Sequence, residues 1–278
     1  MIEERAPAKV NLVLHVGPPR ADGLHPICSL FASLDLADRV RVDVAPDGAD
    51  RVVCPGVEGP NLAASAIELL REALAPAVEL PPLEVRIQKR VPVAAGLGGG
   101  SADAAAVLRA GNELAGRPFR ADELRRIGAR LGADVPSQVE PGHAIVTGAG
   151  ETVERVSLPP MALVLVPQRE GLSTRAVYRE ADRLGGLRAR LDPEAVRVMA
   201  GAGVEGIADG IENDLEPAAL SLRPELARIG AALRAAGALG ALITGSGPTA
   251  VGLFSGRADA ERAARSIPGA MTAEVRAS

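Results

Sequence analysis

A glycine-rich segment in the first half of the chain has the composition of a phosphate-binding loop. Four glycines stand within residues 96–100 of the segment PVAAGLGGGSADAAA. Glycine has no Cβ atom, so several backbone N–H groups can approach one ligand, and positive φ angles cost little. Ser101 follows at the start of a helix, whose free N–H groups and dipole attract anions. The segment therefore predicts phosphate binding, with a plain strand-to-helix turn as the alternative.

The loop differs from the two commonest phosphate-binding motifs. It lacks the Gly-Lys-Ser/Thr ending of a P-loop. It also lacks the acidic residue that ends the next strand about 20 residues after a dinucleotide-binding loop. A third kind of phosphate site is therefore needed. We predict that its phosphate-binding residues are Pro92, Val93, Ala94, Ala95, Gly96, Leu97, Gly98, Gly99, Gly100, Ser101 and Ala102.

Two other segments carry polar residues that could serve the same ligand. APAKVNLVLHV, residues 6–16, alternates, so that Lys9 and Asn11 share one face of a half-buried strand. A single strand lysine is more often solvated than functional. TGSGPTA, residues 244–250, is a second glycine-rich turn, which either joins two strands tightly or offers backbone to a ligand.

These residues must be positioned by strands and helices that cluster along the chain. Residues 38–46 and 83–91 alternate as strands, and residues 61–74 form a helix that Asn61 could cap. Helices are predicted over residues 104–114 and 120–132. A strand and a glycine turn follow in HAIVTGAGE, residues 143–151.

The second half repeats this mixture after the break SLPP, residues 157–160. A fresh apolar strand begins at Met161, and strand-like pieces flank TGSGPTA. Strands and helices do not alternate strictly, which favours an α+β fold over a doubly wound parallel sheet. We predict two domains, residues 1–155 and residues 156–278. The helices predicted for the second half cover residues 174–184, 193–200, 224–236 and 258–267.

Composition narrows the classes of function. The chain has 278 residues and a net charge of −4, and 1% of its residues are aromatic, which disfavours a nucleic-acid partner. No apolar stretch reaches the length of a membrane span, and the acidic N-terminus is unlike a signal peptide, so a cytoplasmic location is expected. Cys28 and Cys54 are too few for a zinc site and are predicted to be buried free thiols.

At this point the chain resembles a family. PVAAGLGGGSADAAA is similar to the second motif of the GHMP kinases, the superfamily of galactokinase, homoserine kinase and mevalonate kinase. APAKVNLVLHV and LITGSGPTAVGLF match its N-terminal and C-terminal motifs in the same order. With ADGLHP, LGADVP and ENDLE, the resemblance is closest to the kinases of 4-diphosphocytidyl-2-C-methyl-D-erythritol, of the non-mevalonate isoprenoid pathway. It spans residues 6–254.

The resemblance implies a fold, a reaction and roles for single residues. The expected fold has an N-terminal domain like ribosomal protein S5 and a ferredoxin-like C-terminal domain. The expected reaction transfers phosphate from ATP, accompanied by Mg²⁺ whose ligands the sequence does not identify, to a hydroxyl of the cytidine-diphosphate-linked polyol. Asp134 of GADVP would accept the proton, although it could instead cap a helix. Lys9 would orient Asp134. The substrate-binding residues implied are Asn11, His25, Tyr178, Gly245, Ser246 and Gly247.

The sequence departs from the family pattern where the cytidine end of the substrate would bind. Leu24 stands where a tyrosine is usual, while His25 and Tyr178 remain. Losing one ring removes about 1–3 kcal/mol of stacking. Two alternatives therefore stay open: a GHMP kinase of the homoserine or mevalonate type, and a nucleotide-binding relative without catalysis. Asn213 and Asp214 of ENDLE are assigned structural roles.

Overall fold

The computed structural model describes residues 1–277 and divides into two compact units that are discontinuous in sequence. Unit 1 contains Met1–Ala8, Leu36–Val93 and Gly98–Pro141. Unit 2 contains Lys9–Asp35, Ala94–Leu97 and the chain from Gly142 onward. Three segments that the division at residue 155 assigned to the N-terminal domain thus belong to unit 2. The division into domains 1–155 and 156–278 stays a prediction.

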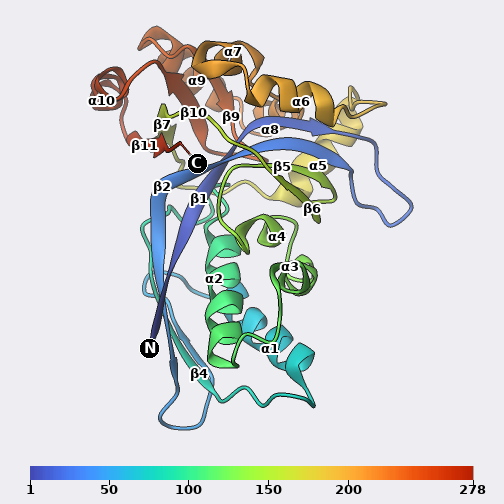
Figure 1. Cartoon of the computed structure of the whole chain (residues 1–278). Helices are drawn as coiled ribbons and strands as arrows, with labels where there is room; N and C mark the ends of the chain where they lie inside the picture. Colours follow the sequence, from blue (N-terminus) through green and yellow to red (C-terminus); the bar gives the residue numbers. More distant parts are fainter. Residues whose placement is uncertain (278) are drawn as a thin grey trace. The chain divides into compact units, whose positions relative to one another are not determined.

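The strands predicted from the sequence are present, several of them longer than predicted, together with three short ones that were not predicted, β3, β6 and β8 (Figure 1). Both β1 and β2 contribute residues to each unit. The strands are β1 (Ile2–Val16), β2 (Ile27–Val44), β3 (Arg51–Val53), β4 (Leu83–Gln88), β5 (Ala144–Gly148), β6 (Thr152–Arg155), β7 (Met161–Val166), β8 (Glu212–Asn213), β9 (Gly240–Ile243), β10 (Ala250–Phe254) and β11 (Met271–Val275).

The helices include all those predicted, together with three short ones that were not, α4, α7 and α8. The α+β fold class is confirmed. The helices are α1 (Leu62–Leu74), α2 (Gly99–Leu114), α3 (Ala121–Ala129), α4 (Val135–Gln138), α5 (Thr174–Leu184), α6 (Pro193–Ala200), α7 (Gly203–Gly210), α8 (Glu216–Leu222), α9 (Leu226–Ala235) and α10 (Arg257–Ser266).

Unit 1 packs helices against one face of a sheet with the strand order β3-β4-β2-β1. The inward side chains of β4 are Leu83, Val85 and Ile87, as the alternation predicts, and all three are buried. They pack with α1 and α2, which lie next to each other (Figure 1). The two helices approach closely at Gly111, where a Cβ atom would lie 2.5 Å from Leu70 Cδ2.

Unit 2 contains the other part of the large sheet and a separate four-stranded sheet. In the large sheet, β8 pairs with β1 in parallel and β5 pairs with β2 and β6. The four-stranded sheet has the order β11-β7-β10-β9, with β11 at an edge as expected, and α9 and α10 contact it (Figure 1). Its core contains Val164, Leu226 and Phe254.

Two expectations about local structure were wrong. The first strand is not half-buried, because every residue from Ala6 to Val16 is buried, including those on the polar face. Helix α2 begins at Gly99, two residues before Ser101 and five before the predicted range 104–114, so that two glycines of the loop belong to its first turn. Asn61 caps α1 as expected, accepting the Ala63 N–H at 2.9 Å. Within residues 1–277, no helix is both long and apolar enough to cross a bilayer.

Candidate active site

The glycine-rich loop ends in an uncapped helix N-terminus. Gly98 precedes α2 with a φ angle of 71°, a conformation that favours glycine, and no side chain caps the helix there. Gly100 is exposed, while Gly99 and Ser101 are half-buried. The first N–H groups of an α-helix have no partner within the helix, so they can bind a ligand. This part of the loop, in unit 1, has the features of a phosphate-binding site.

The preceding part of the loop, Ala94–Leu97 in unit 2, packs against both other motifs. The Lys9 N–H donates to the Leu97 carbonyl at 2.9 Å, and the Thr249 hydroxyl donates to the Ala95 carbonyl at 2.6 Å. A Cβ atom on Gly96 would lie 2.5 Å from the Gly247 carbonyl oxygen, and its φ angle is 77°. Only glycine fits at Gly96. The three motifs that were singled out in the sequence therefore meet within unit 2.

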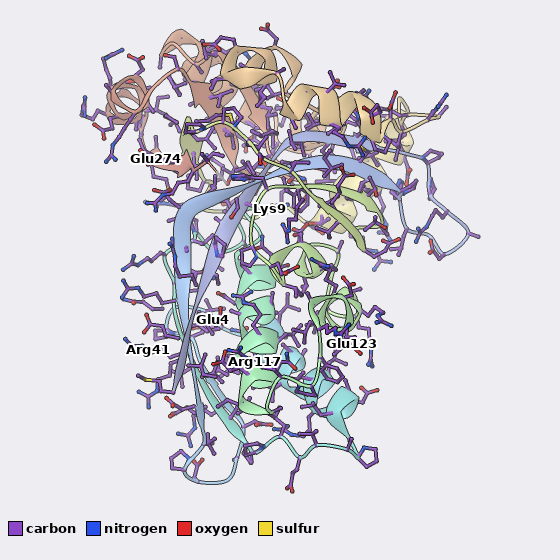
Figure 2. All side chains as sticks on the ribbon, in the orientation of Figure 1. Glu4, Lys9, Arg41, Arg117, Glu123 and Glu274 are labelled. Atoms are coloured by element: carbon purple, nitrogen blue, oxygen red, sulfur yellow. The ribbon has the colours of Figure 1, made fainter. Side chains whose placement is uncertain are left out.

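Lys9 is a buried ammonium with specific partners. Its side chain, labelled in Figure 2, donates to Asn11 Oδ1 at 2.8 Å and lies 4.4 Å from the centre of the Phe31 ring. Lys9 is 4% exposed. Burying a charged group is costly unless it is paired, so a solvated strand lysine is excluded by this geometry. The buried ammonium fits a functional role.

Asn11 links the first strand to the second glycine-rich loop. Its N–H donates to Thr244 Oγ1 at 2.7 Å, and its side-chain amide donates to Ser29 Oγ at 2.8 Å. Its Oδ1 atom, which accepts from Lys9, lies 3.2 Å from the position of a Cβ atom on Gly245. Asn11 and Gly245, both predicted to bind substrate, are thus neighbours. Ser246, a third predicted residue, pairs through its hydroxyl with Thr174 at 2.9 Å.

Asn213, which the sequence analysis treated as structural, braces the second loop directly. Its amide donates to the Ile243 carbonyl at 2.6 Å and to the Gly245 carbonyl at 2.7 Å. Its Oδ1 atom accepts the Leu215 N–H at 2.9 Å. One buried side chain therefore fixes the carbonyls on both sides of Thr244. The signal in the sequence was weak, because an Asn–Asp pair before a helix is also a common capping pattern.

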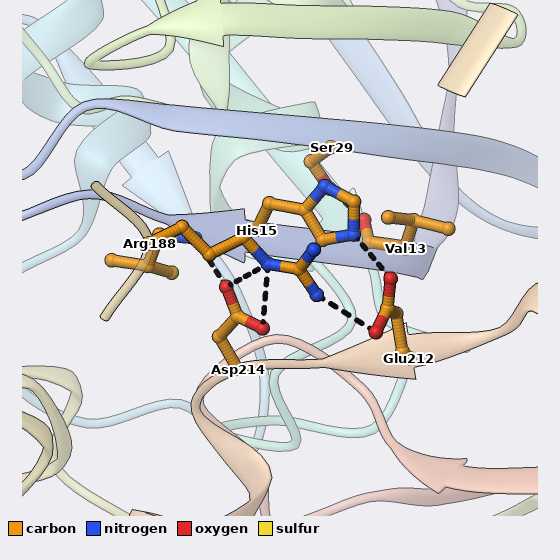
Figure 3. Close-up of polar contacts among 7 residues, drawn as sticks. Val13, His15, Ser29, Arg188, Glu212 and Asp214 are labelled. Atoms are coloured by element: carbon orange, nitrogen blue, oxygen red, sulfur yellow. Dashed lines mark hydrogen bonds and ion pairs between the residues drawn. The ribbon is translucent and has the colours of Figure 1, made fainter. Parts of the chain in front are cut away.

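An ionic network beside β1 fixes Glu212 and Asp214, the residues on either side of Asn213 (Figure 3). Arg188 donates to Glu212 at 2.7 Å and to Asp214 at 2.8 Å. Asp214 also accepts the Val16 N–H at 2.8 Å, and Glu212 contacts His15 Nε2 at 2.6 Å. Burial opposes the ionisation of Glu212, but hydrogen bonds from His15 and Arg188 outweigh it and lower the pKa of Glu212.

The two residues expected at the cytidine end of the substrate lie together in unit 2. The His25 and Tyr178 rings are 4.9 Å apart between centroids and are tilted by 46°. His25 Nδ1 contacts the Gly17 carbonyl at 2.9 Å, and its Nε2 atom lies 3.5 Å from Asp182 Oδ2. Leu24, next in sequence, is 52% exposed. The tilted ring pair is a suitable contact for an aromatic base.

Asp134 lies in unit 1, immediately before the short helix α4. Its backbone occupies the N-cap position, yet its side chain makes no capping hydrogen bond. The bond at this turn is made by Ser137, whose hydroxyl donates to the Asp134 carbonyl at 2.8 Å. Because the alternative of a helix-capping aspartate required that side-chain bond, the geometry disfavours it.

The described residues contain no dedicated metal site. Across residues 1–277, no group of three or more His, Cys, Asp or Glu side chains could hold a metal ion. Cys28 and Cys54 are both free, Cys28 buried as expected and Cys54 only half-buried. Mg²⁺ bound with a nucleotide usually keeps several waters and takes one or two protein oxygens in addition to phosphate oxygens. The residues present are compatible with such a nucleotide-borne ion.

Comparisons with known proteins agree with this arrangement of motifs. The family described as "GHMP kinases N terminal domain" matches residues 61–142, and "GHMP kinases C terminal" matches residues 199–273. A protein of Anaeromyxobacter sp. (strain Fw109-5), named 4-diphosphocytidyl-2-C-methyl-D-erythritol kinase, is 46% identical over 94% of this chain and 85% of its own. A Streptomyces coelicolor protein of the same name is 42% identical over 88% of this chain and 85% of its own.

Solved structures give the same result at the level of the fold. A crystal structure of 4-(cytidine 5'-diphospho)-2C-methyl-D-erythritol kinase has a TM-score of 0.78 and 35% identity, and the match covers 98% of both chains. A homoserine kinase from Cytophaga hutchinsonii, at 19% identity, has a TM-score of 0.73 over 99% of this chain and 94% of its own. With both domain matches and relatives above 40% identity, the chain belongs to the GHMP kinase family, among the 4-diphosphocytidyl-2-C-methyl-D-erythritol kinases.

Proposed function

We propose that this protein transfers the γ-phosphate of ATP to a hydroxyl of 4-diphosphocytidyl-2-C-methyl-D-erythritol. The observation that carries the proposal is the 46% identity to a kinase of that name over 94% of the chain. The convergence of Lys9, Gly96 and Gly247 within unit 2 supports it, because these residues come from the three motifs of the family.

The phosphates of ATP bind to the glycine-rich loop and the start of α2. The N–H groups at Gly99, Gly100 and Ser101 point out of the helix start and are free of a side-chain cap. Together with the positive end of the helix dipole, they bind and orient the phosphate chain. Mg²⁺ neutralises charge on the transferring group when it is bound with ATP, and the Ser101 hydroxyl would supply it with one protein oxygen.

Asp134 and Lys9 act on the acceptor hydroxyl. Asp134 accepts the hydroxyl proton as the oxygen forms its bond to the γ-phosphorus. The bond from the γ-phosphorus to the β,γ-bridging oxygen breaks, and ADP leaves. Lys9, held by Asn11 at 2.8 Å, orients the aspartate and the hydroxyl.

The cytidine end of the acceptor binds to the His25–Tyr178 pair, and the second loop contacts the polyol. The tilted rings, 4.9 Å apart, offer one aromatic face and one polar edge to the base. Leu24 provides an apolar contact in place of a ring. Asn11, Gly245, Ser246 and Gly247 complete the acceptor site. We also propose a cytoplasmic location. The free thiols of Cys28 and Cys54 agree with this reducing compartment.

A panel of alcohol acceptors with ATP, read out as ADP release, tests the proposal. We expect turnover with 4-diphosphocytidyl-2-C-methyl-D-erythritol, and little with homoserine or mevalonate. Turnover with homoserine or mevalonate alone would show that the proposed acceptor is wrong, while the assignment as a kinase would still hold. ATP binding without turnover on any acceptor would identify a non-catalytic relative. The structural neighbours of the homoserine and mevalonate type, at 19% and 16% identity, show the fold alone.

A further inference from the structure

A cluster of three charged residues lies at the base of the glycine-rich loop, within unit 1. Asp38 belongs to β2, Lys89 directly follows β4, and Asp103 belongs to the first part of α2. Lys89 Nζ donates to Asp38 Oδ2 at 2.5 Å and to Asp103 Oδ2 at 2.8 Å. The side chains are 0%, 14% and 4% exposed for Asp38, Lys89 and Asp103. None of the three was predicted as a site residue from the sequence.

The cluster connects the two ends of the loop to each other. Lys89 precedes the predicted ATP-binding segment 92–102 and Asp103 follows it. Asp38 Oδ1 also accepts the backbone N–H groups of Arg90 at 2.5 Å and Val91 at 2.8 Å. The chain is thus held by a carboxylate where it enters the loop, and by an ion pair between its entry and its exit.

The Lys89 ammonium lies directly beside the first residue of α2. A Cβ atom on Gly99 would lie 3.2 Å from Lys89 Nζ and 3.0 Å from Val91 Cγ1. The absence of a side chain at Gly99 therefore leaves room for the lysine. Lys89 therefore contacts the start of the helix whose free N–H groups attract anions.

The charges of the cluster are unevenly balanced. Two carboxylates share one ammonium, and within residues 1–277 Asp103 Oδ1 has no hydrogen-bond partner. Burial raises the pKa of Asp103 to about 6, although Lys89 opposes the change. Burial also acts on Lys89, but the two carboxylates outweigh it and raise its pKa. Cys54, whose pKa is raised mainly by burial, interacts electrostatically with all three residues, and Arg39, Arg41 and Arg86 line a pocket together with Lys89.

We propose that Asp38, Lys89 and Asp103 form a positioning clamp that fixes the glycine-rich loop in its phosphate-binding conformation and so sets the affinity for ATP. The inference rests on the proposed function, since it requires that the loop binds ATP. A buried ion cluster is seldom more stable than well-packed apolar side chains. The cluster lies across the base of this loop, and holding the loop in place explains its presence where stability alone does not.

The first test measures ATP binding by titration calorimetry without an acceptor, alongside the melting temperature. Lys89→Met and Asp38→Asn are compared with Asp50→Asn and Asn112→Ala. Like Asp38, Asp50 is a carboxylate that accepts a hydrogen bond from a backbone N–H, that of Leu83, and pairs with a cation, Arg71. Asn112 forms hydrogen bonds with Phe119 near the far end of α2. We expect the clamp variants to bind ATP about tenfold more weakly and the controls within about twofold of wild type.

The second test measures the affinity for ATP at different pH values. If the cluster had only a structural role, the affinity for ATP would not depend on the ionisation of Asp103. At pH 5 most Asp103 is protonated in the wild type, so that Asp103→Asn should bind ATP equally well. As pH rises to 7, Asp103 ionises and holds Lys89 more firmly, and the variant should fall about tenfold behind the wild type. Lys89→Arg, which keeps the charge, should recover part of the affinity that Lys89→Met loses.

Three outcomes decide the proposal. Clamp variants that bind ATP as tightly as the controls would overturn it, and so would a ratio of Asp103→Asn to wild-type affinity that does not change between pH 5 and 7. If Lys89→Met does not fold, Asp103→Asn and Lys89→Arg give the decision by the same measurements. Failure of the wild-type protein to bind ATP would instead overturn the proposed function.

Discussion

The two glycine-rich loops differ in what their glycines do. In the second loop Thr244 and Thr249 are fully buried, and the hydroxyls of these two residues bond to other segments of unit 2. In the first loop Gly100 is exposed, and the helix start has no side-chain cap. The second loop uses glycine to let backbones pack against each other, as the first loop does at Gly96, whereas at Gly99 and Gly100 the first loop leaves backbone N–H groups open. Glycine content alone does not distinguish a brace from a binding surface.

The largest expected effect separates phosphate binding from phosphate transfer. If the first loop binds ATP by itself, Asp134→Asn should keep the affinity for ATP while kcat falls by about 10²–10⁴. Steady-state kinetics and ATP titration on the same preparation measure both quantities. Asp122→Asn, at the exposed first turn of α3, is the matched control. A near-normal kcat in Asp134→Asn would remove Asp134 from the proposed mechanism.

Alanine at two glycines of the first loop tests the contrast directly. At Gly96 the new Cβ atom would lie 2.5 Å from the Gly247 carbonyl oxygen, in a backbone with a φ angle of 77°. Gly96→Ala should lower the free energy of unfolding by about 3–4 kcal/mol. At Gly100 the new methyl group meets only Leu62 Cδ1, at 3.8 Å.

Gly100→Ala should therefore leave the free energy of unfolding unchanged or raise it by about 0.5–1 kcal/mol, since alanine favours a helix. Its affinity for ATP should fall, because the methyl group adds bulk at an exposed residue of the expected phosphate-binding loop. Chemical denaturation and ATP titration measure the two effects. Equal losses of stability in both variants would contradict the assignment of the packing role to Gly96.

The pH dependence of stability should have opposite slopes for the groups near each loop. Asp103, at the base of the first loop, has its pKa raised by burial from 3.8 to about 6, so the folded state binds more protons than the unfolded state between these values. Its contribution to stability is present below pH 3.8 and is lost as pH rises towards 6, by up to about 3 kcal/mol. Glu212, near the second loop, has a lowered pKa, so its contribution is present above pH 4.5 and is lost on acidification.

Denaturation of Asp103→Asn and Glu212→Gln across pH 3–7 measures these slopes. Relative to the wild type, Asp103→Asn should gain stability as pH rises from about 4 to 6. The difference in the free energy of unfolding between Glu212→Gln and the wild type should decrease as pH falls below 4.5. The same slope in both variants would mean that the two loops are supported in the same way.

The smallest expected loss of stability concerns Asn213, which holds the second loop. Asn213→Ala removes the donors to the Ile243 and Gly245 carbonyls and should lower the free energy of unfolding by about 2 kcal/mol. Because Gly245 belongs to the proposed acceptor site, KM for the acceptor should rise while KM for ATP changes little. A rise in KM for ATP alone would show that the second loop serves the nucleotide.

Local sequence patterns predicted the elements whose two faces differ. The alternation of Leu83, Val85 and Ile87 gave β4, and Asn61 before an apolar helical pattern gave the start of α1. The same reasoning was wrong for β1, because Lys9 and Asn11 are buried by partners far away in sequence, such as Phe31 and Thr244. A single strand pattern cannot reveal that tertiary packing covers its polar face.

The residues of the candidate site were predicted unevenly. Gly96 and Lys9 stand in recognisable motifs, and so could be found from sequence. Asn213 and Lys89 could not be found from sequence, because their roles depend on carbonyls and carboxylates that are distant in sequence and meet them only in the fold. The helix start at Gly99 was missed because glycine disfavours helices, and here the fold overrides that propensity.

The parallel pairing of β1 with β8 has a consequence for synthesis of the chain. Val13 and Leu14 pair with Glu212 and Asn213, which lie 199 residues later in the sequence. A ribosome therefore makes β1 long before its β8 neighbour. Although segments made first usually fold first, this edge of β1 must stay unpaired until Glu212 and Asn213 have been made. Nascent chains stalled before residue 212 should leave the edge of β1 open to proteases and chaperones.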